Sequence, residues 1–258
     1  MKTGISFLSV IPVRENPSDK SQMVSQLLFG ETVKIIDEVK DWFFIQSDGD
    51  QYEGWVDSNQ IKIIDEGVYK NLAKENPVFL INQYLKAIHK NGSILLSLGS
   101  RLPFYNKNGF NIENDHYHFE TAPEIYQGKK SVEEMIKVAK SYIGVPYLWG
   151  GRSYFGLDCS GFSEIVFRAS GYQLPRDSSD QAQVGKVIGF INEAQPGDLA
   201  FFDNEEGRIV HVGILLNNTQ IIHASGSVRI DSIDHQGIFN NHKEKYTHKL
   251  RLIKRVLY

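Results

Sequence analysis

The stretch Leu157-Asp158-Cys159-Ser160-Gly161-Phe162 lies where a loop is expected to become a helix, and it contains the one cysteine of the 258-residue chain. Apolar residues at helical spacing follow it, which predicts a helix over residues 160–169 that Gly171 ends. Cys159 would then lie at the N-terminal boundary of this helix. Unpaired backbone N–H groups and the helix dipole favour negative charge there, so the sequence predicts a lowered thiol pKa and a nucleophilic thiolate.

Two downstream histidines could serve this thiol. His211 in HVGILL and His223 in IIHAS lie on two strand-like runs joined by residues 217–219. A three-residue hairpin loop would place His223 opposite position 213, so that both imidazoles share one face of the sheet, whereas a two-residue loop would separate them. We predict that His211 is the base and acid for Cys159 and that His223 holds its ring in the required tautomer. Two core histidines bonded to the backbone are the alternative.

The composition indicates a globular protein without a nucleic-acid partner. With 41% hydrophobic and 12% aromatic residues, the chain can bury one large core or two to three small ones. The 28 basic and 31 acidic residues give a net charge of -3, so the sequence lacks the basic excess of a nucleic-acid-binding protein. Residues 1–65 carry 6 Lys or Arg and 11 Asp or Glu, which disfavours an anionic polymer or a membrane surface as partner.

The sequence does not favour a metal or an organic cofactor. One cysteine cannot form an intramolecular disulfide, and without a C-x-x-C motif no thiolate zinc site is expected. His116 and His118 would share one face of a strand and could bind a metal, but no further ligand cluster lies nearby in the sequence. A half-exposed strand is therefore the favoured interpretation of this pair, and we expect no cofactor.

The first residues, MKTGISFLSVIPVRENP, lack the pattern of a secretory signal peptide. Their short apolar run is interrupted by Ser6, Ser9 and Pro12, and no A-x-A cleavage pattern follows. No run of the sequence approaches the roughly 20 apolar residues of a membrane span. We interpret the segment as a first strand and expect a cytoplasmic monomer with no membrane partner, although a chain trimmed of its signal peptide would read the same.

The chain is expected to contain three domains. Residues 1–65 alternate short β-type runs with turn signals, which predicts a small barrel, and LLFGETVKIID, DWFFIQ and QYEGWV resemble the runs of a bacterial SH3-like domain. Residues 66–127 open with a helix-compatible piece at 77–89 and continue with strand-like runs separated by Gly and Asn turns. We interpret this part as a second, more divergent SH3-like barrel.

The pattern changes to a helical period at Ser131, where the third domain is expected to begin. Ser131 and Glu134 form a capping-box signature ahead of an apolar stripe, and Gly144 supplies a C-terminal cap. The runs PGDLAFFD, HVGILL, QIIHAS and HKLRLIKRVLY then predict four strands joined by short turns. Helices followed by an antiparallel sheet make an α+β module, so we expect two all-β SH3-like barrels and an α+β catalytic domain over residues 128–258.

Five motifs in order resemble the NlpC/p-sixty family of papain-like cysteine peptidases. They are YLWGG at 147–151, DCSGF at 158–162, PGDL at 196–199, HVGI at 211–214 and IIHAS at 221–225. The resemblance implies a Cys159, His211 and His223 triad that hydrolyses the bond between γ-D-glutamate and a diamino acid of cell-wall peptides. It also implies an acyl-enzyme on Cys159, with the Cys159 amide and Tyr147 as donors to the oxyanion.

SH3-like domains ahead of such a module resemble dipeptidyl-peptidase VI, which releases L-Ala-γ-D-Glu from peptides with a free L-Ala amine. The resemblance implies that Asp177 pairs with this amine, because a buried ammonium requires a carboxylate partner. Positions implied to line the D-Glu subsite are Tyr147, Asp158, Ser160 and Ser178. Tyr52 and Glu15 are implied to close the pocket from the first barrel, with Glu53 as a substitute for Glu15.

Three other polar residues have structural interpretations. Asp198 of PGDL is expected to bond the backbone of a turn, so it is not assigned to catalysis. Arg152 and Arg176 could meet a substrate carboxylate, but solvated arginines are the favoured interpretation.

The sequence therefore favours a peptidase that acts on free murein stem peptides, L-Ala-γ-D-Glu-diamino acid, in their recycling. A secreted endopeptidase that remodels the wall is one alternative, with the SH3-like domains as anchors. A non-enzymatic adaptor whose barrels bind extended ligands is another, and acyl transfer on the same fold is a third. The presence of Cys159, His211 and His223 together disfavours the adaptor.

Overall fold

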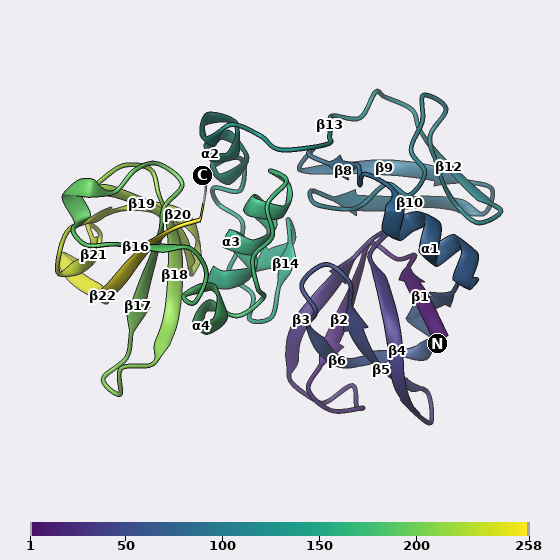
Figure 1. Ribbon diagram of the computed structural model, residues 1–258, viewed down its shortest axis with the longest axis horizontal. Coiled ribbons are helices and arrows are strands. Elements are labelled where there is room, and N and C mark those ends of the chain that lie inside the picture. Colours follow the sequence, from purple (N-terminus) through teal and green to yellow (C-terminus); the bar gives the residue numbers. More distant parts are fainter. Residues whose placement is uncertain (1, 257–258) are drawn as a thin grey trace. The chain divides into compact units, whose positions relative to one another are not determined.

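The computed structural model describes residues 2–256, which divide into two compact units. The first unit comprises the described part of Met1–Lys129 together with Trp149–Phe155, and the second comprises Lys130–Leu148 with the described part of Gly156–Tyr258 (Figure 1). Among the described residues, no helix is long and apolar enough to cross a membrane.

The first unit begins with a seven-stranded antiparallel sheet in the order β3-β2-β6-β5-β4-β1-β7. Its strands are β1 (Lys2–Ser6), β2 (Val10–Arg14), β3 (Met23–Leu28), β4 (Thr32–Val39), β5 (Trp42–Ser47), β6 (Glu53–Asp57) and β7 (Ile61–Ile63), with a 3-10 turn at Ser58–Gln60. Alternate residues, including Ile11, Val13 and Ile45, point into one buried core. The strands expected over residues 1–65 are thereby confirmed.

A helix and a smaller sheet follow in the same unit. They consist of α1 (Glu66–Lys74), β8 (Phe79–Leu80), β9 (Tyr84–His89), β10 (Gly92–Ser97), β11 (Phe110–Ile112), β12 (Asp115–Phe119) and β13 (Ile125–Tyr126), and β14 (Arg152–Ser153) also belongs to this unit. Four strands pair in the order β10-β9-β12-β11, while β13 pairs with β8. A second core, which includes Phe29, Leu80 and Phe110, fills this part of the unit.

The helix expected over residues 77–89 is wrong, because this stretch forms β8 and β9 and the helix lies at Glu66–Lys74. β9 pairs with β10 through a two-residue turn at residues 90–91 and pairs with β12 on its other edge. These two ladders satisfy backbone groups that a helix would satisfy locally, so tertiary pairing overrides the local propensity. In α1, Leu72 faces the second core while Glu66 and Lys70 pair on the exposed face.

The second unit combines three helices with a sheet that closes on itself. The helices are α2 (Val132–Ser141), α3 (Cys159–Arg168) and α4 (Ser178–Gln181), with a 3-10 turn at Ile191–Glu193 and the short strand β15 (Gly156–Leu157). The sheet strands are β16 (Lys186–Ile188), β17 (Leu199–Asp203), β18 (Ile209–Leu215), β19 (Gln220–Ser225), β20 (Ser227–Ile233), β21 (Gly237–Asn240) and β22 (Lys245–Arg255). Their order is β16-β22-β17-β18-β19-β20-β21, and β21 also pairs with β22.

All strand pairs of this sheet are antiparallel, as expected. α3 packs against β18 and β19, and α2 packs against α3, so the helix that starts at Cys159 lies on the strands that carry the two histidines (Figure 1). The capping box of α2 is also confirmed, since Ser131 accepts from the Glu134 amide and Glu134 accepts from the Ser131 amide.

Candidate active site

The helix start at Cys159 is held by a side-chain cap. Asp158 is the N-cap residue of α3, and its Oδ1 accepts a hydrogen bond of 2.7 Å from the Gly161 amide. Cys159 is the first residue of the helix and is 7% exposed, and Phe162 and Ile165 anchor the helix in the core. The expected placement of the cysteine at a helix N-terminus is confirmed.

The expected lowering of the Cys159 pKa is wrong. Burial, followed by the neighbouring Asp158 carboxylate, raises the pKa of the thiol to about 11. The Val212 amide, the Arg176 guanidinium and the Ser160 amide act in the opposite direction and offset only part of this rise. Desolvation of the nearly enclosed sulfur outweighs the effect of the helix start. The resting group is therefore a thiol, and the Val212 N–H that reaches it belongs to β18, the strand that also carries His211.

The two histidines lie on one face of the sheet, as the three-residue loop predicts. Ile214 pairs with Ile222, which sets position 213 opposite His223. Nε2 of His211 lies 2.8 Å from Nδ1 of His223 in a buried hydrogen bond. This contact leaves Nδ1 of His211 as the nitrogen that can exchange a proton with the thiol. The register is confirmed, and the catalytic roles stay predictions.

His211 is enclosed on several sides. Burial, then the neighbouring His223 and His248, lower its pKa well below the usual value, so the ring is a neutral base at physiological pH. The ring of His248, from β22, stacks on that of His211 with centroids 4.1 Å apart. Burial and then His223 lower the pKa of His248 to about 4, so this neighbour is neutral as well.

A carboxylate and a guanidinium complete the buried polar cluster. Nε2 of His223 lies 3.0 Å from Oδ2 of Asp231, and Nη2 of Arg229 donates to Oδ1 of Asp231 over 2.7 Å. Sequence reasoning missed Asp231, Arg229 and His248. The signal that could have found the first two is the spacing Arg229-x-Asp231 on the strand after IIHAS, which places both side chains on one sheet face.

A second buried ion pair surrounds the helix start. Arg176 donates from Nη1 to Oδ1 of Asp158 over 3.0 Å, from Nη2 to Oδ2 over 2.7 Å, and from Nη1 to Oγ of Ser160 over 2.9 Å. The expectation of a solvated Arg176 is wrong, because its side chain is 2% exposed. Asp158 supplies the carboxylate that makes this burial possible. Asp158 and Ser160, which were expected to line the D-Glu subsite, thus hold Arg176 and the helix cap in this structure.

Tyr147 and the start of α4 flank this cluster. Burial, then the charges of Cys159 and Asp158, raise the pKa of Tyr147 to about 12, so its hydroxyl remains a hydrogen-bond donor. Asp177 is the N-cap residue of α4, Ser178 is its first residue, and both are partly exposed directly after Arg176. The second unit therefore brings Tyr147 close to Cys159, Asp158 and Arg176, and Asp177 and Ser178 follow Arg176 in the chain.

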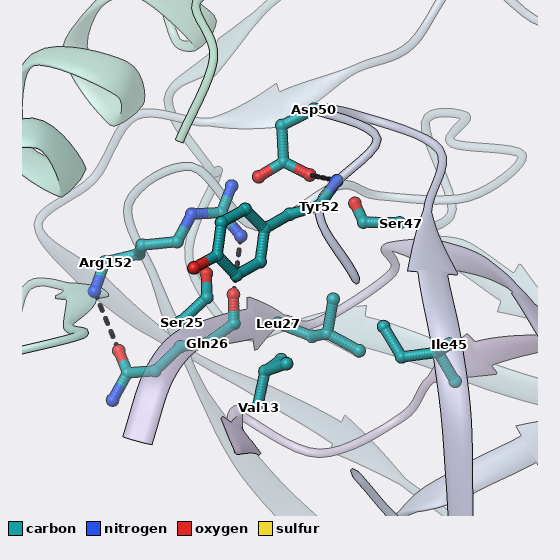
Figure 2. A pocket seen from close by; sticks show the side chains of 9 residues that line it. All are labelled: Val13, Ser25, Gln26, Leu27, Ile45, Ser47, Asp50, Tyr52 and Arg152. Carbon is teal, nitrogen blue, oxygen red and sulfur yellow. Dashed lines mark hydrogen bonds between the residues drawn. The ribbon is translucent and has the colours of Figure 1, made fainter. Parts of the chain in front are cut away.

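The remaining predicted substrate residues, Tyr52, Glu15 and Glu53, belong to the first unit. Tyr52 is partly buried and lines a small pocket, and its amide donates to Oδ1 of Asp50 over 3.1 Å (Figure 2). Glu15 and Glu53 are exposed, and Glu53 accepts from Nε2 of Gln46 over 3.1 Å.

The pocket around Tyr52 also contains Arg152, whose expected solvation is wrong. Figure 2 shows Arg152 beside Tyr52, with its main chain bonded to Gln26. The Arg152 side chain is 1% exposed and donates from Nη1 and Nη2 to the two carboxylate oxygens of Glu31, each over 3.2 Å. A carboxylate placed by the fold inside the first unit is the reason that this arginine is buried.

His116 and His118, the pair considered as metal ligands, lie on β12. Within residues 2–256, no three His, Cys, Asp or Glu side chains are grouped so that they could hold a metal ion. His116 and His118 are exposed on β12 with ring centroids 6.2 Å apart, and Nδ1 of His116 lies 2.9 Å from Oδ1 of Asn111.

PGDL forms the expected turn. Oδ2 of Asp198 accepts from the Gln195 amide over 2.8 Å, and Arg255 donates to both Asp198 oxygens.

The structure places the buried thiol of Cys159 at the start of a helix that packs on an antiparallel hairpin. The hairpin carries the two hydrogen-bonded imidazoles of His211 and His223. This arrangement is typical of a cysteine hydrolase. Two family models match the chain: the NlpC/P60 family over residues 144–250 and the bacterial dipeptidyl-peptidase SH3 domain over residues 13–61. A γ-D-glutamyl-L-lysine dipeptidyl-peptidase of Bacillus subtilis (strain 168) is 32% identical over 222 residues, which cover 78% of this chain and 71% of that protein. The chain belongs to the NlpC/P60 peptidase family and has an SH3-like domain at its N-terminal end.

Other relatives agree with this assignment. The dipeptidyl-peptidase 6 of Lysinibacillus sphaericus is 26% identical over 252 residues, which cover 85% of this chain and 88% of that protein. The crystal structure of an NlpC/P60 family protein from Bacillus cereus ATCC 10987 has a TM-score of 0.83 at 20% identity, and the match covers 99% of this chain and 100% of that one. The latter likeness concerns the fold.

Proposed function

We propose that this chain is a cysteine peptidase that cleaves the bond between γ-D-Glu and the diamino acid of murein stem peptides with a free L-Ala amine, releasing L-Ala-γ-D-Glu. The observation that carries the proposal is the buried thiol of Cys159 on the helix that packs against β18 and β19, the strands of His211 and His223, whose Nε2 and Nδ1 atoms lie 2.8 Å apart. The names of the relatives from Bacillus subtilis and Lysinibacillus sphaericus support the substrate class.

The mechanism begins with a neutral pair. Because the pKa of Cys159 is raised and that of His211 is lowered, the thiol keeps its proton until it attacks the carbonyl carbon. The proton then passes from sulfur to Nδ1 of His211, and the imidazolium returns it to the leaving amine of the diamino acid. Water, with His211 as base, hydrolyses the resulting thioester. The amide of Cys159 at the helix start and the Tyr147 hydroxyl are proposed donors to the oxyanion.

Selection of the free amine is assigned to Asp177, whose carboxylate would pair with the ammonium of L-Ala. Ser178 would contact the D-Glu portion, and Asp158 and Ser160 would act there through the arginine that they hold. Tyr52 and one of the acids Glu15 or Glu53 are the proposed contributions of the SH3-like domain. An N-acylated chain lacks the ammonium, so it would lose this interaction.

The finer domain layout belongs to the same proposal. We infer an SH3-like origin for residues 66–127 and a papain-like arrangement for residues 128–258. We propose that the protein acts as a monomer in the cytoplasm, where it recycles murein peptides. In this proposal it has no nucleic-acid or membrane partner. Cell fractionation and gel filtration of the full chain test the location and the monomeric state.

One experiment tests the chemistry. Purified chain is incubated with L-Ala-γ-D-Glu-L-Lys and with its meso-diaminopimelate counterpart, and products are identified by mass spectrometry. We expect L-Ala-γ-D-Glu from the wild type and none from Cys159→Ala. Equal turnover by the two proteins would reject Cys159 as the nucleophile.

A second experiment separates peptide recycling from wall remodelling. The same peptides are offered with an acetylated L-Ala amine, and intact murein is offered in parallel. We expect cleavage to be abolished by acetylation, and Asp177→Asn to lose activity on the free peptide. Unchanged rates on the acetylated peptide would remove the role of Asp177, and release of fragments from murein would favour the wall-remodelling endopeptidase. Binding without cleavage of any of these would favour the adaptor.

A further inference from the structure

A chain of three hydrogen bonds, the first two of them buried, begins at His211 and ends at a carboxylate and a partly exposed guanidinium. It runs from His211 Nε2 to His223 Nδ1 over 2.8 Å, from His223 Nε2 to Asp231 Oδ2 over 3.0 Å, and from Arg229 Nη2 to Asp231 Oδ1 over 2.7 Å. His211, His223 and Asp231 are 5%, 1% and 4% exposed, so water competes little for these bonds.

The carboxylate determines the direction of every bond in the chain. An ionised carboxylate can only accept, and although burial works against its charge, the hydrogen bonds from His223 and Arg229 lower the pKa of Asp231 overall. Nε2 of His223 must therefore carry the proton that faces Asp231, and when the ring holds this single proton its Nδ1 is an acceptor. Nε2 of His211 then donates to it, and Nδ1 of His211 is unprotonated.

We propose that Asp231 is a positioning residue that sets the tautomers of both histidines and thereby makes Nδ1 of His211 the base for Cys159. The proposal rests on the proposed function of these two residues. It adds Asp231 to the expected group of Cys159, His211 and His223. The ring of His211 is then oriented by a charged residue, Asp231, which acts through His223.

Strand register explains how Asp231 reaches its place. His223 pairs directly with Arg229 across β19 and β20, and Asp231 lies two residues farther along β20 on the same face. Arg229 therefore lies opposite His223 and binds the same carboxylate as His223 does. The other groups that face the pair are neutral: His248 stacks on His211 from β22, and Cys159 approaches from α3.

The charge also assists the proton transfer. When the Cys159 proton moves to Nδ1 of His211, the ring becomes a cation while its Nε2 proton stays on the bond to His223. The negative charge of Asp231, one ring farther along, stabilises this cation. The proton later leaves with the amine product, so Asp231 neither gains nor loses a proton over the reaction.

The variant Asp231→Asn tests the proposal because Arg229 fixes how the new amide lies. Arg229 donates to Oδ1, so the amide oxygen should remain on that side and the NH₂ group should face Nε2 of His223. Both tautomers would then invert, and Nδ1 of His211 would carry a proton. We expect kcat to fall roughly 10²- to 10⁴-fold with KM little changed. ¹⁵N NMR of the histidine side chains should report the exchanged tautomers without any substrate.

A double variant separates this role from a simple loss of an ion pair. In Asp231→Asn with Arg229→Met, the amide is free to turn its oxygen towards His223 and restore the original tautomers. We expect kcat at least about tenfold above that of Asp231→Asn alone. A merely structural role predicts further loss instead. The proposal is overturned if Asp231→Asn keeps the wild-type tautomers, or if the double variant recovers neither tautomers nor rate.

Asp198→Asn is the matched control, since Asp198 is another buried carboxylate of the second unit and is held by two 2.8 Å bonds from Arg255. This variant should lower the melting temperature while the tautomers and kcat stay near those of the wild type. If the wild type fails to cleave the stem peptides, the proposed function fails on its own, whereas the NMR result still decides the role of Asp231.

Discussion

Two arginines, Arg152 of the first unit and Arg176 of the second, form similar ion pairs with different consequences. They are the two bulkiest fully buried side chains among residues 2–256, and each binds one carboxylate through both terminal nitrogens. Arg152 binds Glu31, which also accepts from the Leu28 amide and so fixes a turn of the sheet. Arg176 binds Asp158, which caps the helix that starts at Cys159.

The difference lies in what the carboxylate does besides pairing. Glu31 orders the backbone at the end of β3, so the Arg152 pair supports the fold of the first unit. Asp158 determines where α3 begins, and its negative charge contributes to the raised pKa of Cys159. The same buried chemistry is therefore structural in one unit and linked to the nucleophile in the other.

The largest effect is expected from Arg176→Met. Removing one partner leaves a buried, uncompensated Asp158, which costs roughly 3–5 kcal/mol in the unfolding of the second unit. Peptide cleavage should be lost as well, because the unpaired carboxylate raises the thiol pKa further and strains the helix cap. Urea unfolding followed by fluorescence and a peptide-cleavage assay measure the two effects.

The double variant Arg176→Met with Asp158→Asn is the control for this prediction. Asparagine can still cap the helix and carries no charge, so most of the lost stability should return. If Arg176→Met alone were as stable as the wild type, the prediction would be contradicted. The cost of desolvating the Arg176–Asp158 pair would then cancel its whole contribution to stability.

Arg152→Met should destabilise the first unit by a comparable amount, since Glu31 is then buried without its partner. The loss of kcat should be smaller than for Arg176→Met, because the chemistry at Cys159 belongs to the second unit. Differential scanning calorimetry and kinetics on the same preparations test this contrast. A kcat loss equal to that of Arg176→Met would remove the distinction between the two pairs.

Much of the site followed from the sequence because it depends on local spacing. The capping box, the helix start at Cys159 and the register of the two histidines are set by residues close in the chain, and the structure confirms all three. The helix expected over residues 77–89 is wrong, since pairing with strands on both edges decided the structure there. Local rules cannot report such distant partners.

The missed residues share the same physical cause. Asp231 reaches His223 through the pairing of β19 with β20, and His248 reaches His211 from β22, far along the chain. No short sequence pattern encodes these contacts. Arg152 and Arg176 were expected in solvent because arginine is seldom buried, and only the folded chain reveals the carboxylates that hold them. The predicted direction of the Cys159 pKa shift was wrong for a similar reason, because burial of the sulfur outweighs the effect of the local backbone N–H groups.

The raised Cys159 pKa predicts a pH dependence of stability in the second unit. In the unfolded chain the thiol ionises near pH ~8.5, whereas the folded thiol holds its proton until about pH 11. Below the unfolded pKa both states are protonated and the contribution is fully present. As the pH rises from ~8.5 to about 11, only the unfolded state releases a proton, so the free energy of unfolding falls.

Cys159→Ala provides the comparison for this measurement, because it lacks the titrating group. Urea unfolding at several pH values should show a steeper alkaline decline for the wild type than for this variant. Alkylation of the single cysteine by iodoacetamide should accelerate with pH well past ~8.5 in the folded protein. Parallel pH curves for the two proteins would contradict the raised pKa.

The smallest effect concerns the other side-chain cap of the second unit. Ser131 caps α2 by accepting from the Glu134 amide over 3.3 Å, and Glu134 accepts from the Ser131 amide over 3.0 Å, but this cap is exposed and the cation next to it is Lys130, 3.7 Å from Oε1 of Glu134. Ser131→Ala should therefore cost about 1 kcal/mol of stability and leave the pH profile of cleavage unchanged. Asp158→Ala removes a cap that also accepts from the third residue of its helix, but it frees Arg176 as well, so it should cost several times more and alter the profile. Equal losses from the two variants would mean that the capping bond alone, and not the buried charge pair, accounts for the stability at the start of α3.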